Sequence, residues 1–533
     1  MADRAQTERN LIQRVNIGDS LTRAASARPQ HPAVIDGDRH WTYAAFNAWV
    51  NRLANGLTGL GYRRGDALAI ASGNSAEFLA LYYACAKTGV VAVPINLGWR
   101  PAEVAYVLDH SGARGLAVES QLVPAMQEAI GKVPVIADVI VMPGLQADCQ
   151  SGPTERHWLT TAKLGDASDA EPDCYVEDRD AISYLYTSGT TSFPKGVVGT
   201  HLAIYLESMS GALDSGWSGT DRFAAMMPMF HTAQLNAFCT PAVLVGATTY
   251  VLRGFDPAAF LDLIEREQIT QVFGLPMMFR AALDHPSFAG RDVSSLRRAV
   301  YAMAPMPDEL IRRCLAEFGC DFALLFGQTE MSPITTLFRP EHQLSHIGAV
   351  GSPLTGVQVA IMSPDGALLP PGEQGEIVYR GPSTMAAYLK SPEATATAFS
   401  RGWFHSGDVG RFGDDGVLWF ADRYKDVIKT GGENVASIEV EKALYAADPR
   451  IAEAVVVGLP HERWTEAITA VVVPKPGESI DPAQLTATLR EQQLLDGYKV
   501  PKSVIIVDEL PKTSTGKIQK NVVRDQHAAH YKG

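Results

Sequence analysis

The chain has 533 residues, 46% of them hydrophobic, and its 46 lysines and arginines against 59 aspartates and glutamates leave a net charge of −13. This length predicts several domains, because a domain ordinarily spans about 100–200 residues. The acidic balance argues against a nucleic-acid-binding protein, whose contact surface is ordinarily basic. Six cysteines without a CxxC pair, in a chain long enough to need no disulfide bonds, favour a reduced cytoplasmic location.

The sequence predicts neither a signal peptide nor a membrane span. The N-terminus, MADRAQTERN, is polar. The longest apolar stretch, residues 78–97, is interrupted by Lys87, Gly89 and Pro94, so it predicts a buried helix followed by a strand. Peripheral membrane contact and homo-oligomer formation both remain open.

Helical periods and short β-rich runs alternate from about Trp41 to Arg339. Such alternation predicts parallel sheets covered by helices. The clearest predicted helices are 76–86 and 257–267, and the clearest predicted strands are 90–93, 182–186 and 271–273.

Residues 350–420 have a different texture, because short apolar runs are separated by Gly, Pro and Asp turns. This pattern predicts a small antiparallel or barrel-like unit. Its predicted strands are 357–361, 375–379 and 417–420.

After Ala421 the chain is polar through DRYKD and then returns to mixed elements. We predict helices at 437–445 and 482–493, with strands at 453–457, 467–473 and 503–507. We therefore predict an α/β protein with an N-terminal domain at 1–421, a hinge at 422–425 and an α+β C-terminal domain at 426–533. The large domain is expected to hold two parallel helix-covered sheets and the barrel-like subdomain.

A hydroxyl-rich loop follows the predicted strand 182–186. Gly lets the backbone approach a phosphate, hydroxyl and amide groups can surround the phosphate, and the lysine adds a positive charge. The loop is not a Walker A motif, because its Lys precedes its Gly. A Ser/Thr-rich surface loop is the alternative, but the preceding strand and the Pro-Lys-Gly after it favour phosphate binding. The expected phosphate-contacting residues are Thr187, Ser188, Gly189, Thr190, Thr191 and Lys195.

The segment YTSGTTSFPKG resembles the signature loop of the ANL adenylate-forming superfamily, with Ser192 where the family usually has Gly. That superfamily contains acyl-CoA synthetases, peptide-synthetase adenylation domains and luciferases. Each further motif alone would fit a turn, a linker or an exposed lysine. The ordered set, spanning about Thr22 to Gln526, identifies the chain as a member, in the acyl-CoA synthetase branch for fatty or aryl acids. The further motifs are FGQTE at 326–330, WFHSGD at 403–408, DRYKDVIKTGGEN at 422–434 and PKTSTGK at 511–517.

The resemblance implies four residues with roles in the chemistry. Lys517 is expected to stabilise charge on the α-phosphate, and Thr329 to bond an α-phosphate oxygen. Glu330 is expected to hold Mg²⁺ together with Thr187. MFH at 229–231 resembles the place where acyl-CoA synthetases carry an aromatic residue or a histidine, so His231 is expected at the acid pocket.

The resemblance also implies the residues that bind the nucleotide and the thiol. Asp408 and Arg423 are expected at the ribose, and Gln328 at the nucleotide. Lys425 is expected at the point about which a mobile C-terminal domain rotates. Rotation is expected to bring Gly431, Gly432 and Glu433 to the tunnel for the coenzyme A thiol.

The implied function is that of an ATP-dependent carboxylic acid–CoA ligase. An acyl-adenylate forms with release of pyrophosphate, and coenzyme A then takes the acyl group with release of AMP. The expected cofactors are ATP, Mg²⁺ and coenzyme A, the partner is a small-molecule carboxylic acid, and no nucleic acid is involved.

The acid itself is weakly specified. The pocket is expected near 231–238, 273–278 and 301–305, where Ala302 and Met303 replace family glycines and should narrow one wall. We expect Met277 and Met278 to lie in the core. A medium- or long-chain fatty acid, and hence fatty acid metabolism, is the first choice, and an aryl or arylpropenoic acid is the second.

Three other functions share these motifs. An amino-acid or carrier-loading adenylating enzyme usually has Asp where this chain has His231. A luciferase-type oxidase would be separated by its product. A degenerate acyl-binding protein is disfavoured by the intact Lys517, Glu330 and Asp408.

Overall fold

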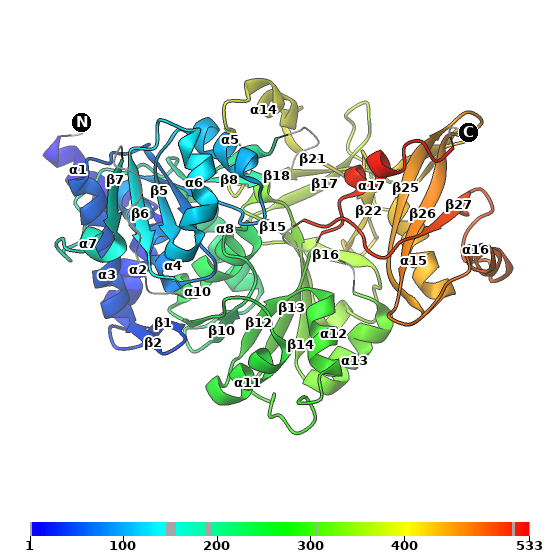
Figure 1. The fold of residues 1–533 in the computed structure, drawn as a ribbon, viewed down its shortest axis with the longest axis horizontal. Coiled ribbons are helices and arrows are strands. Elements are labelled where there is room, and N and C mark those ends of the chain that lie inside the picture. The colour runs from blue at the N-terminus through cyan, green and yellow to red at the C-terminus, as the bar shows by residue number, and fades with distance from the viewer. Residues whose placement is uncertain (1–2, 145–155, 188–192, 305, 514–516, 532–533) are drawn as a thin grey trace. The chain divides into compact units, whose positions relative to one another are not determined.

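The computed structural model describes residues 3–144, 156–187, 193–304, 306–513 and 517–531. The chain forms two compact units (Figure 1): residues 1–359 with 379–404 make the first, and residues 360–378 with 405–533 make the second. The predicted hinge at 422–425 lies inside the second unit, and its role as a domain boundary stays a prediction.

Two sheets form the frame of the first unit. In one sheet, the neighbours from β14 through β13, β12, β10 and β11 to β1 are all parallel. The antiparallel strands β15 and β16 extend it on one side, and β2 on the other. In spatial order these strands are β16 (Ala349–Pro353), β15 (Ile334–Phe338), β14 (Asp321–Gly327), β13 (Arg298–Tyr301), β12 (Gln271–Gly274), β10 (Arg222–Ala225), β11 (Thr248–Val251), β1 (Pro32–Asp36) and β2 (Arg39–Thr42).

The other sheet of this unit is parallel from β8 to β7. β8 and β9 are antiparallel, since the loop at 188–194 is too short for the crossover that parallel strands need. The predicted parallel, helix-covered sheets are thus confirmed, with antiparallel strands at the edges. In spatial order the strands are β19 (Ala387–Tyr388), β9 (Lys195–Thr200), β8 (Ala181–Thr187), β4 (Val91–Pro94), β3 (Ala67–Ala71), β5 (Ala113–Glu119), β6 (Asp138–Met142) and β7 (His157–Thr160).

Helices lie against both sheets (Figure 1). α4 has every side chain buried, because a helix that is apolar all round belongs to a core. It begins where the Ser75 hydroxyl accepts the Phe78 N–H and ends at the left-handed Gly89. The helices of the first unit are α1 (Arg4–Gln13), α2 (Ile17–Ala27), α3 (Tyr43–Gly59), α4 (Ala76–Thr88), α5 (Pro101–Ser111), α6 (Val123–Gly131), α7 (Thr161–Leu164), α8 (His201–Asp214), α9 (Thr232–Gln234), α10 (Thr240–Val245), α11 (Pro257–Glu267), α12 (Pro276–Asp284), α13 (Asp308–Phe318) and α14 (Pro392–Ala398).

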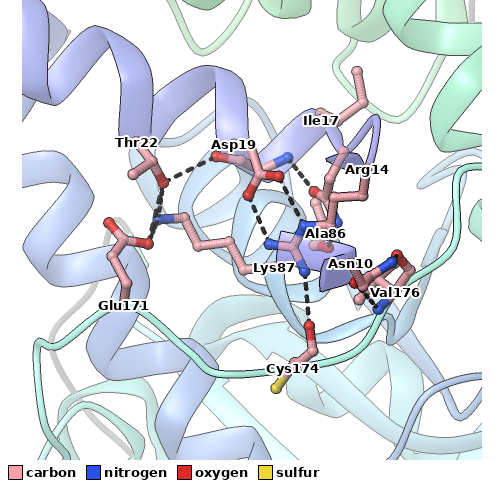
Figure 2. Close-up of polar contacts among 12 residues, drawn as sticks. Asn10, Arg14, Ile17, Asp19, Thr22, Ala86, Lys87, Glu171, Cys174 and Val176 are labelled. Carbon is pink, nitrogen blue, oxygen red and sulfur yellow. Dashed lines mark hydrogen bonds and ion pairs between the residues drawn. The ribbon is translucent and has the colours of Figure 1, made fainter. Parts of the chain in front are cut away.

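A polar cluster ties the N-terminal helices to the segment that precedes β8 (Figure 2). The ammonium of Lys87, in the last turn of α4, is buried and lies 2.6 Å from the Glu171 carboxylate and 2.8 Å from the Thr22 hydroxyl. The Arg14 guanidinium bonds Asp19 and donates to the Cys174 carbonyl. A buried ammonium persists only when oxygens replace its hydration shell, so these contacts fix the segment in place.

The second unit has two groups of strands. β17 (Gln358–Met362), β18 (Gly375–Arg380), β21 (Trp403–Phe412) and β22 (Leu418–Arg423) are neighbours in that order, and β21 and β22 are antiparallel. β24 (Glu433–Val435), β23 (Ile428–Thr430), β26 (Thr465–Pro474) and β25 (Ile451–His461) form a separate sheet, in which β27 (Ser503–Ile506) also pairs with β26.

Both faces of this separate sheet are covered by helices, α15 (Ser437–Ala447) and α16 (Pro482–Glu491) on one side and α17 (Lys520–Gln526) on the other. Alternate side chains of β25 point to opposite faces, so Val456 joins the cluster of Leu444 and Leu489, while Val457 joins that of Val523.

The predicted elements agree with these bounds to within a few residues. The predicted helix 257–267 has the bounds of α11, and the predicted strand 182–186 lies within β8. One packing prediction is wrong. Met278 is buried, but the Met277 side chain is 58% exposed, because consecutive helical residues of α12 face different directions.

Candidate active site

The strands on either side of the hydroxyl-rich loop bring its two ends together. β8 ends at Thr187 and β9 begins at Lys195, and these two residues are register partners in the antiparallel pair. The loop between them therefore closes a hairpin whose ends carry a hydroxyl and an ammonium. The predicted Ser188, Gly189, Thr190 and Thr191 lie outside the described residues.

A tyrosine connects Lys195 to Glu330. The Lys195 Nζ lies 5.1 Å from the centroid of the Tyr388 ring, and the Tyr388 hydroxyl donates to Glu330 Oε1 at 2.8 Å. Burial, and then the Glu330 charge, raise the pKa of Tyr388 far above its usual value, so the hydroxyl stays a donor. Two predicted site residues thus meet through a residue that the sequence reasoning missed.

The signal for Tyr388 in the sequence is weak. It is an aromatic residue in the short apolar run MAAYL, which core packing explains equally well. Its position is set by β19, whose edge pairs with β9 so that Tyr388 lies opposite Val197. The Met385 N–H also donates to the Glu330 carbonyl at 2.6 Å.

The residues of FGQTE leave the end of β14 in a tight turn. Thr329 begins a short 3₁₀-helix that ends in the left-handed Ser332, and the Gln328 N–H donates to the Pro333 carbonyl at 2.9 Å. The Gln328 Nε2 is buried with no hydrogen-bond partner in the described part of the chain. A buried donor without a hydrogen-bond partner, at the carboxyl end of a parallel strand, is typical of a group that faces a ligand.

The residues at this turn fit a phosphate-bound Mg²⁺. The described ranges contain no group of three or more His, Cys, Asp or Glu side chains that could hold a metal by themselves. Mg²⁺ at a nucleotide needs one or two protein oxygens, because water and phosphate supply the others. The half-buried Glu330 uses one carboxylate oxygen on Tyr388 and keeps the second, and Thr187 is the other predicted ligand.

His231 begins the segment predicted to border the acid. Its Nδ1 accepts the Ala233 N–H at 3.2 Å, so the neutral ring carries its hydrogen on Nε2 and can donate there. Asn74 holds the preceding residues by accepting from the Met229 N–H and donating to the Met227 carbonyl. The histidine backbone is therefore fixed by the core of the unit.

Two of the predicted acid-pocket segments are in contact. The Phe238 ring stacks on the Phe273 ring with centroids 4.4 Å apart, and both side chains are buried. Phe238 lies in a π-helical turn, Leu235–Cys239, a distortion that occurs mostly at functional sites. Asn236 accepts the Tyr82 hydroxyl and donates to Thr232, so its amide is already engaged.

The third predicted segment follows β13. Met303 has a φ of 69°, which is rare for a residue other than Gly, Asn or Asp, and its side chain is half-buried. The backbone thus keeps the left-handed conformation that a glycine would adopt there, and adds a long side chain. Pro305 lies outside the described residues.

In the second unit the predicted ribose residues face each other. Asp408 and Arg423 are register partners in β21 and β22, and Asp408 Oδ1 lies 3.4 Å from Arg423 Nε. Asp408 is buried, and its carboxylate oxygens are able to accept hydrogen bonds from hydroxyl groups.

Lys517 lies in the electrostatic field of this pair. Its backbone N–H donates to the Thr513 hydroxyl, and its carbonyl accepts the Thr513 N–H. Although the residue is exposed, desolvation by surrounding protein, and then the Arg423 charge, lower its pKa to about 8, against the opposing effect of Asp408. Lys425 contributes in the same direction as Arg423. The second unit therefore brings together four predicted site residues.

Gly431 and Gly432 form the tip of the β23–β24 hairpin, and both have positive φ. The Gly431 N–H donates to the Trp464 carbonyl, and a Cβ at Gly431 would lie 3.3 Å from the Trp464 ring. The Arg463 guanidinium lies 4.5 Å from the centroid of the Trp464 ring, and the Lys502 ammonium lies 5.2 Å from it. The predicted thiol face thus includes an aromatic surface between two cations, which the sequence did not indicate.

Comparison with known proteins places the chain in a family. Residues 21–389 match the AMP-binding enzyme family, and residues 439–517 match the AMP-binding enzyme C-terminal domain. The chain belongs to the AMP-binding enzyme family. The superfamily that the ordered motifs predicted is thereby confirmed, whereas the division between fatty and aryl acids is not resolved.

Relatives of this AMP-binding enzyme resemble it over almost their whole length. A feruloyl-CoA synthase of Amycolatopsis sp is 37% identical over 508 residues, which cover 95% of this chain and 98% of the relative. The long-chain-fatty-acid–CoA ligase FadD13 of Mycobacterium tuberculosis is 33% identical over 527 residues, covering 96% and 99%. The crystal structure of ATP-bound MatB from Rhodopseudomonas palustris has a TM-score of 0.88 at 28% identity, covering 97% and 100%.

These findings confirm the predicted α/β fold and the predicted enzyme class. This AMP-binding enzyme is an AMP-forming acid–thiol ligase of the acyl-CoA synthetase kind. None of the helices among the described residues has the length and apolar character needed to cross a bilayer.

Proposed function

We propose that this enzyme activates a carboxylic acid with ATP as the acyl-adenylate and then transfers the acyl group to coenzyme A. The observation that carries the proposal is the Asp408–Arg423 pair of the second unit, whose charges act on Lys517. An ammonium near a pair that can take ribose hydroxyls suits the α-phosphate, where charge develops during adenylation.

In the first step the acid carboxylate attacks the α-phosphorus, and the bond to the departing pyrophosphate breaks. The protein has little covalent work to do, so positioning and charge stabilisation dominate. Protonated Lys517 and the Thr329 hydroxyl stabilise the α-phosphate oxygens. Lys195 and Thr187 hold the outer phosphates at the ends of the hairpin loop, where a bound Mg²⁺ would offset the phosphate charge.

In the second step the coenzyme A thiol attacks the acyl carbonyl, and AMP leaves. The exposed Gly431–Gly432 tip lacks side chains, which suits the narrow pantetheine arm. Trp464 with Arg463 and Lys502 suits the adenine ring and phosphates of the same molecule, because a purine stacks on an aromatic face and cations bind phosphate. Rotation of the C-terminal domain about Lys425 would move Lys517 away from the acyl-adenylate and bring this face to it.

Two acid classes are proposed, in line with the relatives that act on feruloyl and long-chain fatty acyl groups. A medium- or long-chain fatty acid was predicted first. The stacked Phe238 and Phe273 rings favour the aryl alternative, because they fill the space next to the turn that carries His231 and limit its depth. Met303, whose side chain is half-buried, is expected to narrow one wall of the same predicted pocket.

The test is ATP-dependent thioester formation with acids of graded length and aromaticity, read by mass spectrometry. We expect AMP and an acyl-CoA in equal amounts with at least one acid. The panel should run from hexanoate to palmitate, with benzoate and cinnamate-type acids alongside. A phosphopantetheine carrier protein replaces coenzyme A in a parallel reaction. Acyl transfer to the carrier alone would refute the coenzyme A assignment, and no ATP consumption with any acid would refute adenylation.

A further inference from the structure

A buried polar network joins the predicted hinge to the start of α15. The backbone of Asp422 belongs to β22, one residue before its end, but its carboxylate bonds the start of α15. The Asp422 Oδ2 accepts both the N–H and the hydroxyl of Ser437, each at 2.6 Å. Both residues are buried, so these hydrogen bonds are protected from water.

Lys520 enters this network from α17. Its ammonium donates to the Ser437 hydroxyl and lies 2.8 Å from Glu441 Oε1. The Glu441 carboxylate also accepts the Val456 N–H of β25 at 2.9 Å. The Lys520 and Glu441 side chains are each 17% exposed, so the ammonium is held by two residues of α15 rather than by solvent.

A second ion pair fixes the same helix to the same segment. The Arg524 guanidinium, one turn beyond Lys520 on α17, bonds the Asp426 carboxylate and donates to the Lys425 carbonyl at 3.4 Å. α17 thus contacts Lys425 and Asp426 directly, and it reaches Asp422 through Ser437.

These contacts bear on Lys517, which precedes Lys520 by three residues. The Thr513 and Lys517 backbones close their loop on one side, and α17 begins on the other. Ile518 pairs with Lys512 in an antiparallel bridge, and the Gln519 N–H donates to the Pro511 carbonyl at 2.8 Å. The start of α17 is therefore continuous with the paired backbone next to Lys517. The segment 422–426, which α17 contacts, also contains Arg423, the partner of Asp408.

We propose that Lys520 is a positioning residue for adenylation, which holds Lys517 beside Asp408 and Arg423 by anchoring α17 to Ser437 and Glu441. This inference rests on the proposed function of Lys517. Lys520 itself need not touch substrate. A displacement of about 1 Å at a reacting group can cost about 100-fold in rate, so a loose anchor should appear in the step that uses Lys517.

The charges in this network explain why an apolar residue could not replace Lys520. Burial raises the pKa of the Glu441 carboxyl, nearby Asp422 adds to the shift, and Lys520 opposes it. Without the ammonium, two carboxyl groups would share a site with no positive charge between them. The network would then rearrange and the start of α17 would move.

The experiment measures the two half-reactions separately in the full-length enzyme. Pyrophosphate exchange reports adenylation, and thioester formation from supplied acyl-AMP reports transfer. The variants are Lys520→Met, Lys520→Arg and Ser437→Ala. Lys442→Met is the matched control, because Lys442 is exposed on α15 next to Glu441 and makes no hydrogen bond or ion pair within the described residues.

We expect Lys520→Met to slow pyrophosphate exchange by about 100-fold while transfer changes less than about twofold. Lys520→Arg should restore most of the exchange, and Lys442→Met should leave both steps unchanged. Ser437→Ala keeps every charge and should also slow pyrophosphate exchange while sparing transfer. It replaces Lys520→Met as the test if Lys520→Met fails to fold.

Equal losses in both half-reactions, or normal exchange in both Lys520→Met and Ser437→Ala, would overturn the inference. The proposed function is tested apart from it by Lys517→Ala. If Lys517→Ala exchanges pyrophosphate normally, the role of Lys517 is wrong. If Lys517→Ala is inactive in exchange and Lys520→Met is normal, the role of Lys517 stands and the anchoring role of Lys520 is wrong.

Discussion

The lowered pKa of Lys517 predicts a pH dependence for adenylation. Protonated lysine is the form that stabilises the α-phosphate, and its pKa in the free enzyme is about 8. The ratio kcat/KM for ATP reports groups of the free enzyme, so it should be level below pH 8 and fall above it.

The size of the fall follows from the titration of one group. With a pKa of about 8, the protonated fraction is about 0.9 at pH 7 and about 0.09 at pH 9. The ratio kcat/KM for ATP in pyrophosphate exchange should therefore drop about tenfold between these pH values. Desolvation, and then the neighbouring Arg423, set the sign of the pKa shift, because both favour the neutral amine.

The assay is pyrophosphate exchange from pH 6.5 to 10 at constant ionic strength and excess Mg²⁺. Lys517→Arg serves as the matched variant, because a guanidinium stays protonated throughout this range. Whatever its absolute rate, its profile should be level where that of the wild type falls. Transfer from supplied acyl-AMP should instead rise with pH as the coenzyme A thiol ionises.

A wild-type profile that stays level to pH 10 would contradict this reasoning. So would a fall near pH 8 that persists in Lys517→Arg, since some other group would then be responsible.

Four further predictions concern single side chains. Tyr388→Phe keeps the ring beneath Lys195 but removes the donor to Glu330, so the KM for Mg-ATP should rise about tenfold while the melting temperature changes little. Gly431→Trp should block transfer and spare pyrophosphate exchange, because even a Cβ there meets the Trp464 ring; unchanged transfer would exclude this thiol route. Lys425→Pro should leave one half-reaction active and stop the other, and normal rates in both would exclude Lys425 as the hinge. Burial raises the pKa of Glu207 well above its usual value, so the wild type loses stability as pH rises above about 4.5; calorimetry should find Glu207→Gln more stable at pH 8, with the difference vanishing near pH 4.

The sequence predicted the frame of the fold because its signals are local. α11 begins with the Asp256 cap and Pro257 and carries a regular apolar face, and its predicted bounds agree with the structure. β25 and β26 were placed correctly but are longer than predicted, since their end residues pair with each other, as Ile451 does with Pro474, and the local sequence does not show this pairing.

The candidate site was predictable where a motif marks it and not where contacts across the fold make it. Thr187, Lys195, Asp408 and Arg423 were all named from motifs, and strand register pairs Thr187 with Lys195 in the first unit and Asp408 with Arg423 in the second. Tyr388 lies in the site because β19 pairs with β9, and these strands are almost 200 residues apart in the chain. The Ser437–Lys520 contact likewise joins residues whose local sequence predicts only a helix start.

The polar cluster of Figure 2 has a practical consequence for anyone who shortens the N-terminus. α1 has no buried side chain, so it looks dispensable. Yet the Asn10 amide exchanges two hydrogen bonds with the Val176 backbone, and the Val15 N–H donates to Asp178. That stretch leads directly into β8. Chains trimmed past residue 9 should thus lose the hydrogen bonds that hold the segment before β8, the strand that ends at Thr187, and tags are better placed before Met1 than in exchange for the first helix.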